Sequence, residues 1–329
     1  IPNLKEWIDE KLINKYNFVS WKESLEKLHN PEIEDTYGEK NLFRRRLAFD
    51  ELLAHQLAIC IIRTIDNKKK SVIFKNNNKL KNNLIKSLEF KLTNSQLKVV
   101  SEIQKDLISN KQMIRLLQGD VGSGKTIVAL LSMLTVIESG YQVTLMAPTS
   151  ILAYQHYDNI SKLIKDFPIE IDILTGKDKG KKRLEKLDKI IKGNTQIIIG
   201  THALIQDGVN FKKLGLSVID EQHRFGVYQR MAFNYKGFRP SILVMSATPI
   251  PRTLTLAAYG DMDESKIIEK PIGRKPIKTS SLNLKKEKNL IARIKNKIIN
   301  ANDKFFWVCP LIEESQELDL KAATDRYNT

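Results

Sequence analysis

Short apolar runs alternate with amphipathic stretches through the central part of the chain. Strands are predicted at residues 113–118, 141–147, 170–174, 195–200, 214–219 and 240–246, and helices at 125–139, 150–164 and 181–193. Strand–helix alternation favours right-handed crossovers and a parallel sheet covered by helices on both faces. We therefore expect an α/β domain, completed by the strand at 240–246, whose ligands bind at the carboxyl ends of its strands.

The segment before this domain has a different pattern. Leucine and isoleucine recur at helical spacing over residues 44–63, which predicts a helix. The triple arginine 44–46 at its start could contact phosphates or could form a solvated face. The polar, asparagine-rich stretch 67–83 is predicted to be a loop or linker.

Charge and composition narrow the possible partners. The 329 residues include 54 Lys and Arg against 38 Asp and Glu, a net charge of +16. This excess favours nucleic acid or a membrane surface, although abundant Lys, Asn and Ile would also follow from an A- and T-rich coding bias. Cys60 and Cys309 lack the spacing of a disulfide scaffold or a zinc module and fit a reducing cytosol. No apolar run approaches about 20 residues, so no membrane span is expected.

A phosphate-binding motif follows the first predicted strand. GDVGSGKT matches G-x-x-x-x-G-K-[ST] in full and stands between a predicted strand and a predicted helix. Its glycines permit positive φ, and its N–H groups and the helix N-terminus would hold the phosphates of ATP. Lys125 is expected to reach the β- and γ-phosphates and Thr126 to ligate Mg²⁺. The motif comprises Gly119, Asp120, Val121, Gly122, Ser123, Gly124, Lys125 and Thr126.

Two adjacent carboxylates, Asp220 and Glu221, end the strand predicted at 214–219. Negative charges at the end of a buried strand need a positive partner. A P-loop enzyme requires an Asp at this place to hold Mg²⁺, directly or through water. We expect Asp220 to take that role and Glu221 to orient or deprotonate the attacking water. The alternative is a surface Asp–Glu pair after an edge strand.

Gln222 and His223 come next, and ATP hydrolysis alone does not require them. A motor needs such groups, because its site must report whether the γ-phosphate is present. Ser246 and Thr248 follow the last predicted strand, so their hydroxyls are expected to hydrogen-bond His223 and to couple the nucleotide to the next segment. Ser-Ala-Thr and a lone histidine are weak signals by themselves, but the order P-loop, DEQH and SAT is much more specific than its parts.

These motifs resemble those of superfamily 2 helicases and translocases, and more narrowly the RecG family of bacterial ATP-dependent DNA helicases, which remodel stalled forks and branched recombination intermediates. Transcription-repair coupling factors share the P-loop and ATPIPRTL, whereas DEQHRFG together with CPLIEES favours the RecG family. The resemblance spans nearly the whole chain. It rests on RRRLAFDELLAHQLA (44–58), FKLTNSQ (90–96), LLQGDVGSGKT (116–126), MAPTSILAYQH (146–156), IIIGTHALIQ (197–206), VIDEQHRFGVYQR (218–230), SATPIPRTL (246–254), GDMDES (260–265), PIGRKPIKT (271–279) and WVCPLIEESQELDLKAA (307–323).

The resemblance implies two DNA-contact segments and a base-reading motif. Both DNA segments follow predicted strand ends and lack carboxylates, which agrees with contact to a phosphate backbone. The alternatives are a helix N-cap at residue 149 or 150 and a buried histidine at 202. The first segment contains Pro148 and Thr149, the second contains Gly200, Thr201 and His202, and the adenine-reading Q motif contains Phe90 and Gln96.

The domain organisation implied by the resemblance has three parts. Residues 1–88 would form a helical linker region, 89–276 a RecA-like P-loop NTPase lobe that binds ATP, and 277–329 the incomplete start of a second RecA-like lobe. The family's wedge domain and later motifs, including an arginine finger, have no counterpart in the chain. We therefore expect the chain alone to hydrolyse ATP poorly.

The leading prediction is an ATP-dependent helicase or translocase that uses Mg²⁺ and remodels branched DNA, as a monomer in the bacterial cytosol near the nucleoid. One alternative is a double-stranded DNA translocase similar to transcription-repair coupling factor. Another is a non-catalytic module that binds ATP or DNA. A small-molecule P-loop kinase would lack the SAT and DNA-contact segments. Comparing ATP hydrolysis with and without branched DNA separates these readings.

Overall fold

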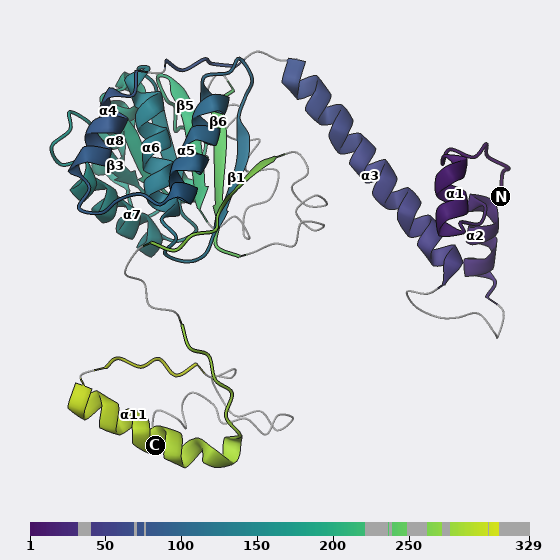
Figure 1. Cartoon of the computed structure of the whole chain (residues 1–329). Helices are drawn as coiled ribbons and strands as arrows, with labels where there is room; N and C mark the ends of the chain where they lie inside the picture. The colour runs from purple at the N-terminus through teal and green to yellow at the C-terminus, as the bar shows by residue number, and fades with distance from the viewer. Residues whose placement is uncertain are drawn as a thin grey trace. The chain divides into compact units, whose positions relative to one another are not determined.

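The computed structural model describes residues 1–31, 41–68, 71–75, 77–220, 236, 239–248, 262–271, 277–301 and 303–308. The chain divides into two compact units, Ile1–Gly273 and Arg274–Thr329. The first unit contains the predicted sheet and the helices that precede it along the chain (Figure 1).

A seven-stranded sheet forms the centre of the first unit, in the order β3-β4-β2-β5-β6-β1-β7 (Figure 1). Every neighbouring pair of strands is parallel. The predicted α/β fold is therefore confirmed, and the six predicted strands are all present. The strands are β1 (Ile114–Gly119), β2 (Gln142–Met146), β3 (Ile171–Leu174), β4 (Ile197–Gly200), β5 (Leu214–Asp220), β6 (Ser241–Ser246) and β7 (Asp263–Ile267).

Strand β7 corrects one expectation, because the strand at 240–246 was predicted to complete the sheet. β7 pairs with β1 at the edge of the sheet. Its sequence DESKI has no apolar run, and only Ser265 and Ile267 within it are buried. An edge strand with one covered face needs few apolar residues, so hydropathy gives it little signal.

Helices cover both faces of the sheet, as predicted. Residues that alternate along the strands enter two separate cores, for example Leu117 and Leu145 in one and Leu116 and Met146 in the other. The first core also takes residues from α4, α5, α6 and α7, and the second takes residues from α8 and η1. These elements are α4 (Lys79–Ser87), α5 (Asn94–Leu107), α6 (Lys125–Glu138), α7 (Ser150–Leu163), α8 (Gly180–Lys192) and η1 (His202–Leu204).

Part of the stretch 67–83, predicted to be a linker, packs onto this lobe. Phe74 is 2% exposed and meets Tyr141 edge-on, with ring centroids 5.3 Å apart. Its backbone N–H donates to the carbonyl of Leu107. Leu84, in α4, is fully buried in the same core. The expected domain boundary at residue 88 therefore cuts through a packed unit.

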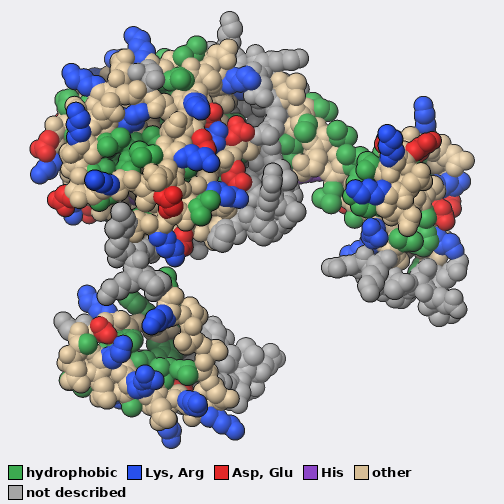
Figure 2. Space-filling model, viewed as in Figure 1, with side chains coloured by type: hydrophobic (Ala, Val, Ile, Leu, Met, Phe, Trp, Pro, Cys, Tyr) green, Lys and Arg blue, Asp and Glu red, His purple; other side chains and the backbone are tan. Residues whose placement is uncertain are grey.

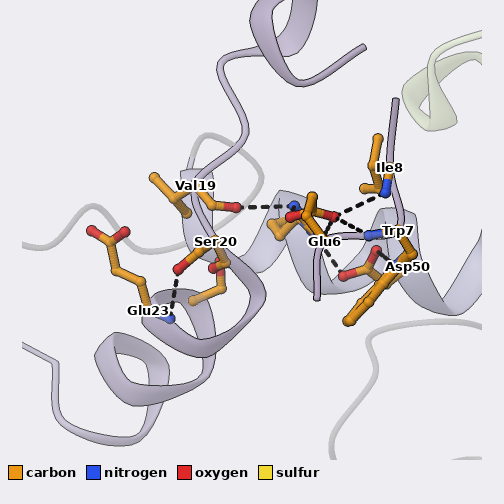
Figure 3. A network of polar contacts seen from close by, with 9 residues as sticks. Glu6, Trp7, Ile8, Val19, Ser20, Glu23 and Asp50 are labelled. Carbon is orange, nitrogen blue, oxygen red and sulfur yellow. Dashed lines mark hydrogen bonds and ion pairs between the residues drawn. The ribbon is translucent and has the colours of Figure 1, made fainter. Parts of the chain in front are cut away.

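The N-terminal segment and its helices meet at a buried arginine, Arg46, whose partners Glu6, Val19 and Asp50 are labelled in Figure 3. The helices are α1 (Glu10–Tyr16), α2 (Trp21–His29) and α3 (Leu42–Lys68), the last of which confirms the helix predicted over 44–63. In the triple arginine, Arg44 and Arg45 are exposed, but Arg46 is fully buried. Arg46 therefore neither contacts phosphates nor belongs to a solvated face, and both predictions are wrong for this residue, since its guanidinium is paired inside the protein.

The guanidinium of Arg46 meets two carboxylates and a carbonyl. It donates two hydrogen bonds to Glu6, at 2.8 and 2.9 Å, and one to Asp50 at 2.9 Å. A fourth goes to the carbonyl of Val19 at 3.1 Å, and the ring of Trp7 lies 5.4 Å away. Buried charges are tolerated when they are paired and hydrogen-bonded in this way.

The second unit contains α11 (Glu287–Ala301), preceded by the short η3 (Leu284–Lys286). The flanking described residues, 277–283 and 303–308, have no regular secondary structure, so the strands of a second lobe are not observed there. Among the described residues of the whole chain, no helix combines the length and apolar character needed to cross a bilayer.

Candidate functional site at the carboxyl edge of the sheet

The predicted phosphate-binding loop joins β1 to α6 and is tightly folded. Gly122 and Gly124 have φ of 72° and 91°, a region that favours glycine. A Cβ atom on Gly119 would lie 2.6 Å from the Ser123 hydroxyl oxygen. The spacing of the glycines therefore has a direct conformational cause in this structure.

Lys125 and Thr126 occupy the first turn of α6, where backbone N–H groups point out of the helix. Lys125 Nζ donates to the carbonyls of Gly119 and Asp120, at 2.7 and 3.2 Å, so its charge lies inside the loop. Ser123 is 1% exposed, and its hydroxyl has no partner among the described residues. A buried hydroxyl without a partner, beside a lysine and a helix N-terminus, fits a loop built to receive phosphate oxygens.

Gln96 holds the loop from the side of α5. Its Nε2 donates to the Ser123 carbonyl at 2.7 Å, and its Oε1 accepts from the Thr93 N–H at 2.9 Å within a capping box. Gln96 is 2% exposed, and a Cβ on Gly124 would clash with its amide. The oxygen and the nitrogen of the Gln96 side-chain amide are thus both hydrogen-bonded within the protein. Phe90 is 51% exposed. Adenine reading by these two residues stays a prediction.

Asp220 ends β5 and forms a contact that the sequence did not reveal. Its Oδ2 lies 2.7 Å from Nε2 of His156 on α7, and both side chains are 12% exposed. Nε2 is the donor when the carboxylate is ionised, since an ionised carboxylate only accepts hydrogen bonds. The sequence alone does not indicate this role for His156, because its partner lies 64 positions further along the chain.

Oxygen ligands for Mg²⁺ are available at this edge. Thr126 contributes a hydroxyl at the start of α6, and Asp220 a carboxylate at the end of β5. Strand β1, which leads to Thr126, and strand β5, which ends in Asp220, lie on either side of β6 and are therefore about 10 Å apart. Among the described residues, no group of three or more His, Cys, Asp or Glu could hold a metal alone. This donor set fits Mg²⁺, which in nucleotide sites takes few protein ligands together with phosphate oxygens.

The predicted coupling hydroxyls lie at the end of β6, the strand between β1 and β5, and two residues after it. Ser246 and Thr248 lie with their hydroxyl oxygens 3.1 Å apart. Gln118, on the neighbouring β1, donates to the Thr248 carbonyl at 3.0 Å. This places the SAT segment directly beside the end of the strand that leads into the P-loop. The residues expected to complete the site, Glu221, Gln222 and His223, lie outside the described residues.

A hollow beside the P-loop is lined by residues from β1 and from β7, including Gln118, Gly119 and Ile267. Lys270, just after β7, forms an ion pair with Asp120 of the P-loop at 3.2 Å. The strand that hydropathy did not predict therefore forms one wall next to the phosphate loop.

The two predicted DNA-contact segments follow β2 and β4 at the same edge of the sheet. Met146 and Gly200 are paired in register, and the Ala147 N–H donates to the Gly200 carbonyl at 2.8 Å. Thr149 is the N-cap of α7 and accepts a hydrogen bond from the Leu152 N–H, so the N-cap reading is correct as a structural role. Its exposed hydroxyl can still donate to a phosphate.

In the second segment, Gly200 is required by packing. A Cβ there would clash with the Leu174 carbonyl of β3. Thr201 and His202 are half-buried, and His202 begins η1. The alternative reading of His202 as a buried histidine is therefore wrong, while DNA contact by these residues stays a prediction.

Comparisons with known proteins agree with this geometry. The family described as DEAD/DEAH box helicase matches residues 93–256. The ATP-dependent DNA helicase RecG of Haemophilus influenzae is 45% identical over 97% of this chain and 48% of its own length. RecG of Bacillus subtilis is 42% identical over 99% of this chain and 47% of its own length. The chain thus spans about half the length of the curated relatives it matches.

Solved structures give the same result. The structure of RecG bound to a three-way DNA junction aligns with a TM-score of 0.74 and 39% identity, over 90% of this chain and 40% of that one. The DEAD-box helicase Mss116, at 18% identity and a TM-score of 0.53 over 71% of this chain and 54% of its own, shares the fold. Identity across nearly the whole chain and a shared fold over most of it show that this chain is similar to about half of RecG.

Proposed function

We propose that this chain forms the ATP-binding part of an ATP-dependent DNA helicase or translocase that acts on branched DNA. One observation carries the proposal: the P-loop, Asp220 and both predicted DNA segments lie along a single edge of one parallel sheet. Relatives named ATP-dependent DNA helicase RecG, and a RecG structure with a three-way junction, support it.

In this proposal, the P-loop binds the triphosphate of ATP. The N–H groups at the start of α6 donate to the phosphate oxygens, and Gly122 and Gly124 let the backbone come close. Lys125 would exchange its present contacts with the Gly119 and Asp120 carbonyls for the β- and γ-phosphates. Gln96 holds the Ser123 carbonyl, so the loop needs little rearrangement when the nucleotide arrives.

Thr126 and Asp220 would hold Mg²⁺. When bound, the ion would help to neutralise the negative charge of the phosphates. The contact of His156 with Asp220 Oδ2 would fix the carboxylate and leave its other oxygen for the ion. Glu221 follows directly in the sequence and is proposed to orient the attacking water and accept its proton.

Coupling to DNA would use the loops that follow β2 and β4. These loops lie on the same edge as the nucleotide site. Helix α7 links the loop after β2 to that site, because its N-cap is Thr149 and its His156 contacts Asp220. His223 would read the nucleotide state through Ser246 and Thr248. A monomeric state, Mg²⁺ as the ion, and a place near the nucleoid of a bacterial cytosol belong to the same proposal.

The test is ATP hydrolysis by the protein with no DNA, with linear duplex and with a three-way junction. We expect the junction to raise turnover and the Lys125→Ala variant to lose tight nucleotide binding and turnover. Lys98→Ala, an exposed lysine on α5, is the matched control and should behave like the parent protein. Turnover that ignores DNA would contradict the proposed function, and nucleotide binding without turnover would leave a non-catalytic module.

A further inference from the structure

A short segment, residues 266–270, follows β7 and leads to the boundary between the two units. We call it the connector, and none of its residues was predicted for the site. Ser95 of α5 holds it, because the Ser95 hydroxyl accepts from the N–H of Ile268 at 3.0 Å and the Ser95 N–H donates to Glu269 Oε2 at 3.2 Å. The next residue of α5, Gln96, holds the P-loop. One turn of one helix therefore contacts both the connector and the P-loop.

The connector starts from a firmly held strand. Arg115 of β1 is 9% exposed, and its guanidinium donates to the Ser265 hydroxyl of β7 at 2.9 Å and to Asp106 of α5 at 2.7 Å. The Ser265 hydroxyl in turn donates to Glu102 of α5. These contacts fix β7 against β1 and α5, so the lobe itself sets where the residues just after β7 lie.

The end of the connector reaches the P-loop. Lys270 Nζ lies 3.2 Å from Oδ2 of Asp120, the second residue of the loop. The other carboxylate oxygen of Asp120 accepts from the Val121 N–H at 2.8 Å, and the Asp120 carbonyl accepts from Lys125 Nζ at 3.2 Å. Because Lys125 is proposed to bind the phosphates, the Asp120 carboxylate lies close to the phosphate site. A negative charge there repels the nucleotide unless a cation offsets it.

We propose that Lys270 is a positioning residue for the nucleotide. Its ammonium offsets the charge of Asp120 beside the phosphates, and it thereby ties the connector to the occupied P-loop. The inference rests on the proposed function and deepens it, since it makes the connector part of the nucleotide site.

The ion pair matters more when the nucleotide is bound. The side chains of Lys270 and Asp120 are 46% and 56% exposed, and exposed ion pairs contribute little to stability. The triphosphate of ATP brings several negative charges next to Asp120, so the positive charge of Lys270 becomes more favourable there. By linkage, a cation that strengthens nucleotide binding is itself held more firmly when the nucleotide is present. We therefore expect the connector to be less mobile with nucleotide than without it.

Positive charge in general does not single out Lys270. Lys and Arg are spread over the visible face of the first unit rather than gathered at one place (Figure 2). Lys105 supplies a comparison within α5, because it is exposed and lies in the last turn, at the opposite end from Gln96 and about 14 Å away along the helix axis. Lys105→Met removes the same charge as Lys270→Met, but far from the P-loop.

The experiment measures the binding of ATPγS with Mg²⁺ to the protein by isothermal titration calorimetry. Lys270→Met should weaken binding by about 3- to 10-fold at low salt, because Asp120 then repels the phosphates without compensation. The loss should shrink as KCl is added, since salt screens exposed charges. Adding Asp120→Asn to Lys270→Met should restore the parent affinity, because asparagine keeps the acceptor for the Val121 N–H but carries no charge. Lys270→Arg and Lys105→Met should match the parent protein.

A second measurement follows the connector directly. Hydrogen–deuterium exchange, read by mass spectrometry on peptides that cover residues 266–270, reports on the Ile268 N–H that is bonded to Ser95. ATPγS should slow this exchange in the parent protein and in Lys105→Met, and should slow it less in Lys270→Met.

Three results would overturn the inference. One is equal ATPγS affinity for Lys270→Met and Lys105→Met, since any loss would then reflect net charge alone. Another is a loss in Lys270→Met that Asp120→Asn does not restore, since the lysine would then have a structural role only. The third is exchange of the connector that ATPγS leaves unchanged in the parent protein.

Parent protein that binds no ATPγS would instead refute the proposed function, and the inference with it. Circular dichroism checks that the variants are folded. If Lys270→Met is unfolded, Lys270→Gln replaces it, with the same expected loss and the same contradicting results.

Discussion

Replacing Arg46 by methionine tests whether the buried arginine holds the N-terminal helices together. Methionine fills part of the volume but cannot donate the four hydrogen bonds that go to Glu6, Asp50 and the Val19 carbonyl (Figure 3). Removing one partner of a buried ion pair costs about 3–5 kcal/mol, because the remaining charge is left buried and unpaired.

The exposure of the two carboxylates decides where in this range the cost falls. The side chain of Asp50 is 12% exposed, so water cannot replace the arginine fully. The side chain of Glu6 is 35% exposed and can be hydrated once the arginine is gone. Loss of the contact with Trp7 adds on the order of 0.5–1 kcal/mol. We therefore expect about 3 kcal/mol, near the lower end of the range.

The assay is urea unfolding followed by the fluorescence of Trp7 and Trp21, whose rings lie 6.1 Å apart. Trp307 belongs to the other unit and is replaced by phenylalanine in every sample. A loss of about 3 kcal/mol lowers the midpoint by about 1–3 M, for slopes of about 1–3 kcal/mol per M. Arg45→Met is the matched control, because Arg45 is exposed and its loss should change stability by no more than about 0.5 kcal/mol. Equal midpoints for the two variants would refute the reasoning.

Three further predictions concern other contacts. His156→Phe should weaken Mn²⁺ binding by about 10-fold in the presence of a non-hydrolysable ATP analogue, as measured by electron paramagnetic resonance. The affinity for the nucleotide without metal should not change. Equal Mn²⁺ affinity in the variant and the parent protein would show that the contact with Asp220 does not position that carboxylate. Gly124→Ala should lower nucleotide affinity and thermal stability, because φ of 91° and the Gln96 amide both oppose a side chain; a fully active, stable variant in calorimetry would count against this. The hydrogen bond from the buried arginine, opposed by burial, holds the pKa of Glu6 below its ordinary value, so its stabilisation is complete at neutral pH and is lost as pH falls through the lowered pKa. Urea midpoints measured down to about pH 3 should fall more steeply in the parent protein than in the arginine variant, and parallel curves would speak against it.

The sequence by itself determined the elements whose signal is local. Apolar runs predict the six strands, and apolar residues at helical spacing predict the helices between them, because each element buries those residues in the core. The phosphate loop follows from its glycines, and Asp220 from its place at the end of a buried strand. Parallel topology then requires all of these loops to share one edge, which the sheet confirms.

Tertiary structure alone decided the partners of the buried polar groups. Arg46 stands in a run of three arginines, and nothing local shows that its carboxylates include Glu6, 40 positions away. His156 and Gln96 have partners 64 and 27 positions along the chain. Strand β7 is held by pairing with β1, not by an apolar pattern of its own. In each case the stabilising contact joins residues that are far apart in the sequence, so the residues next to each one do not indicate its partner.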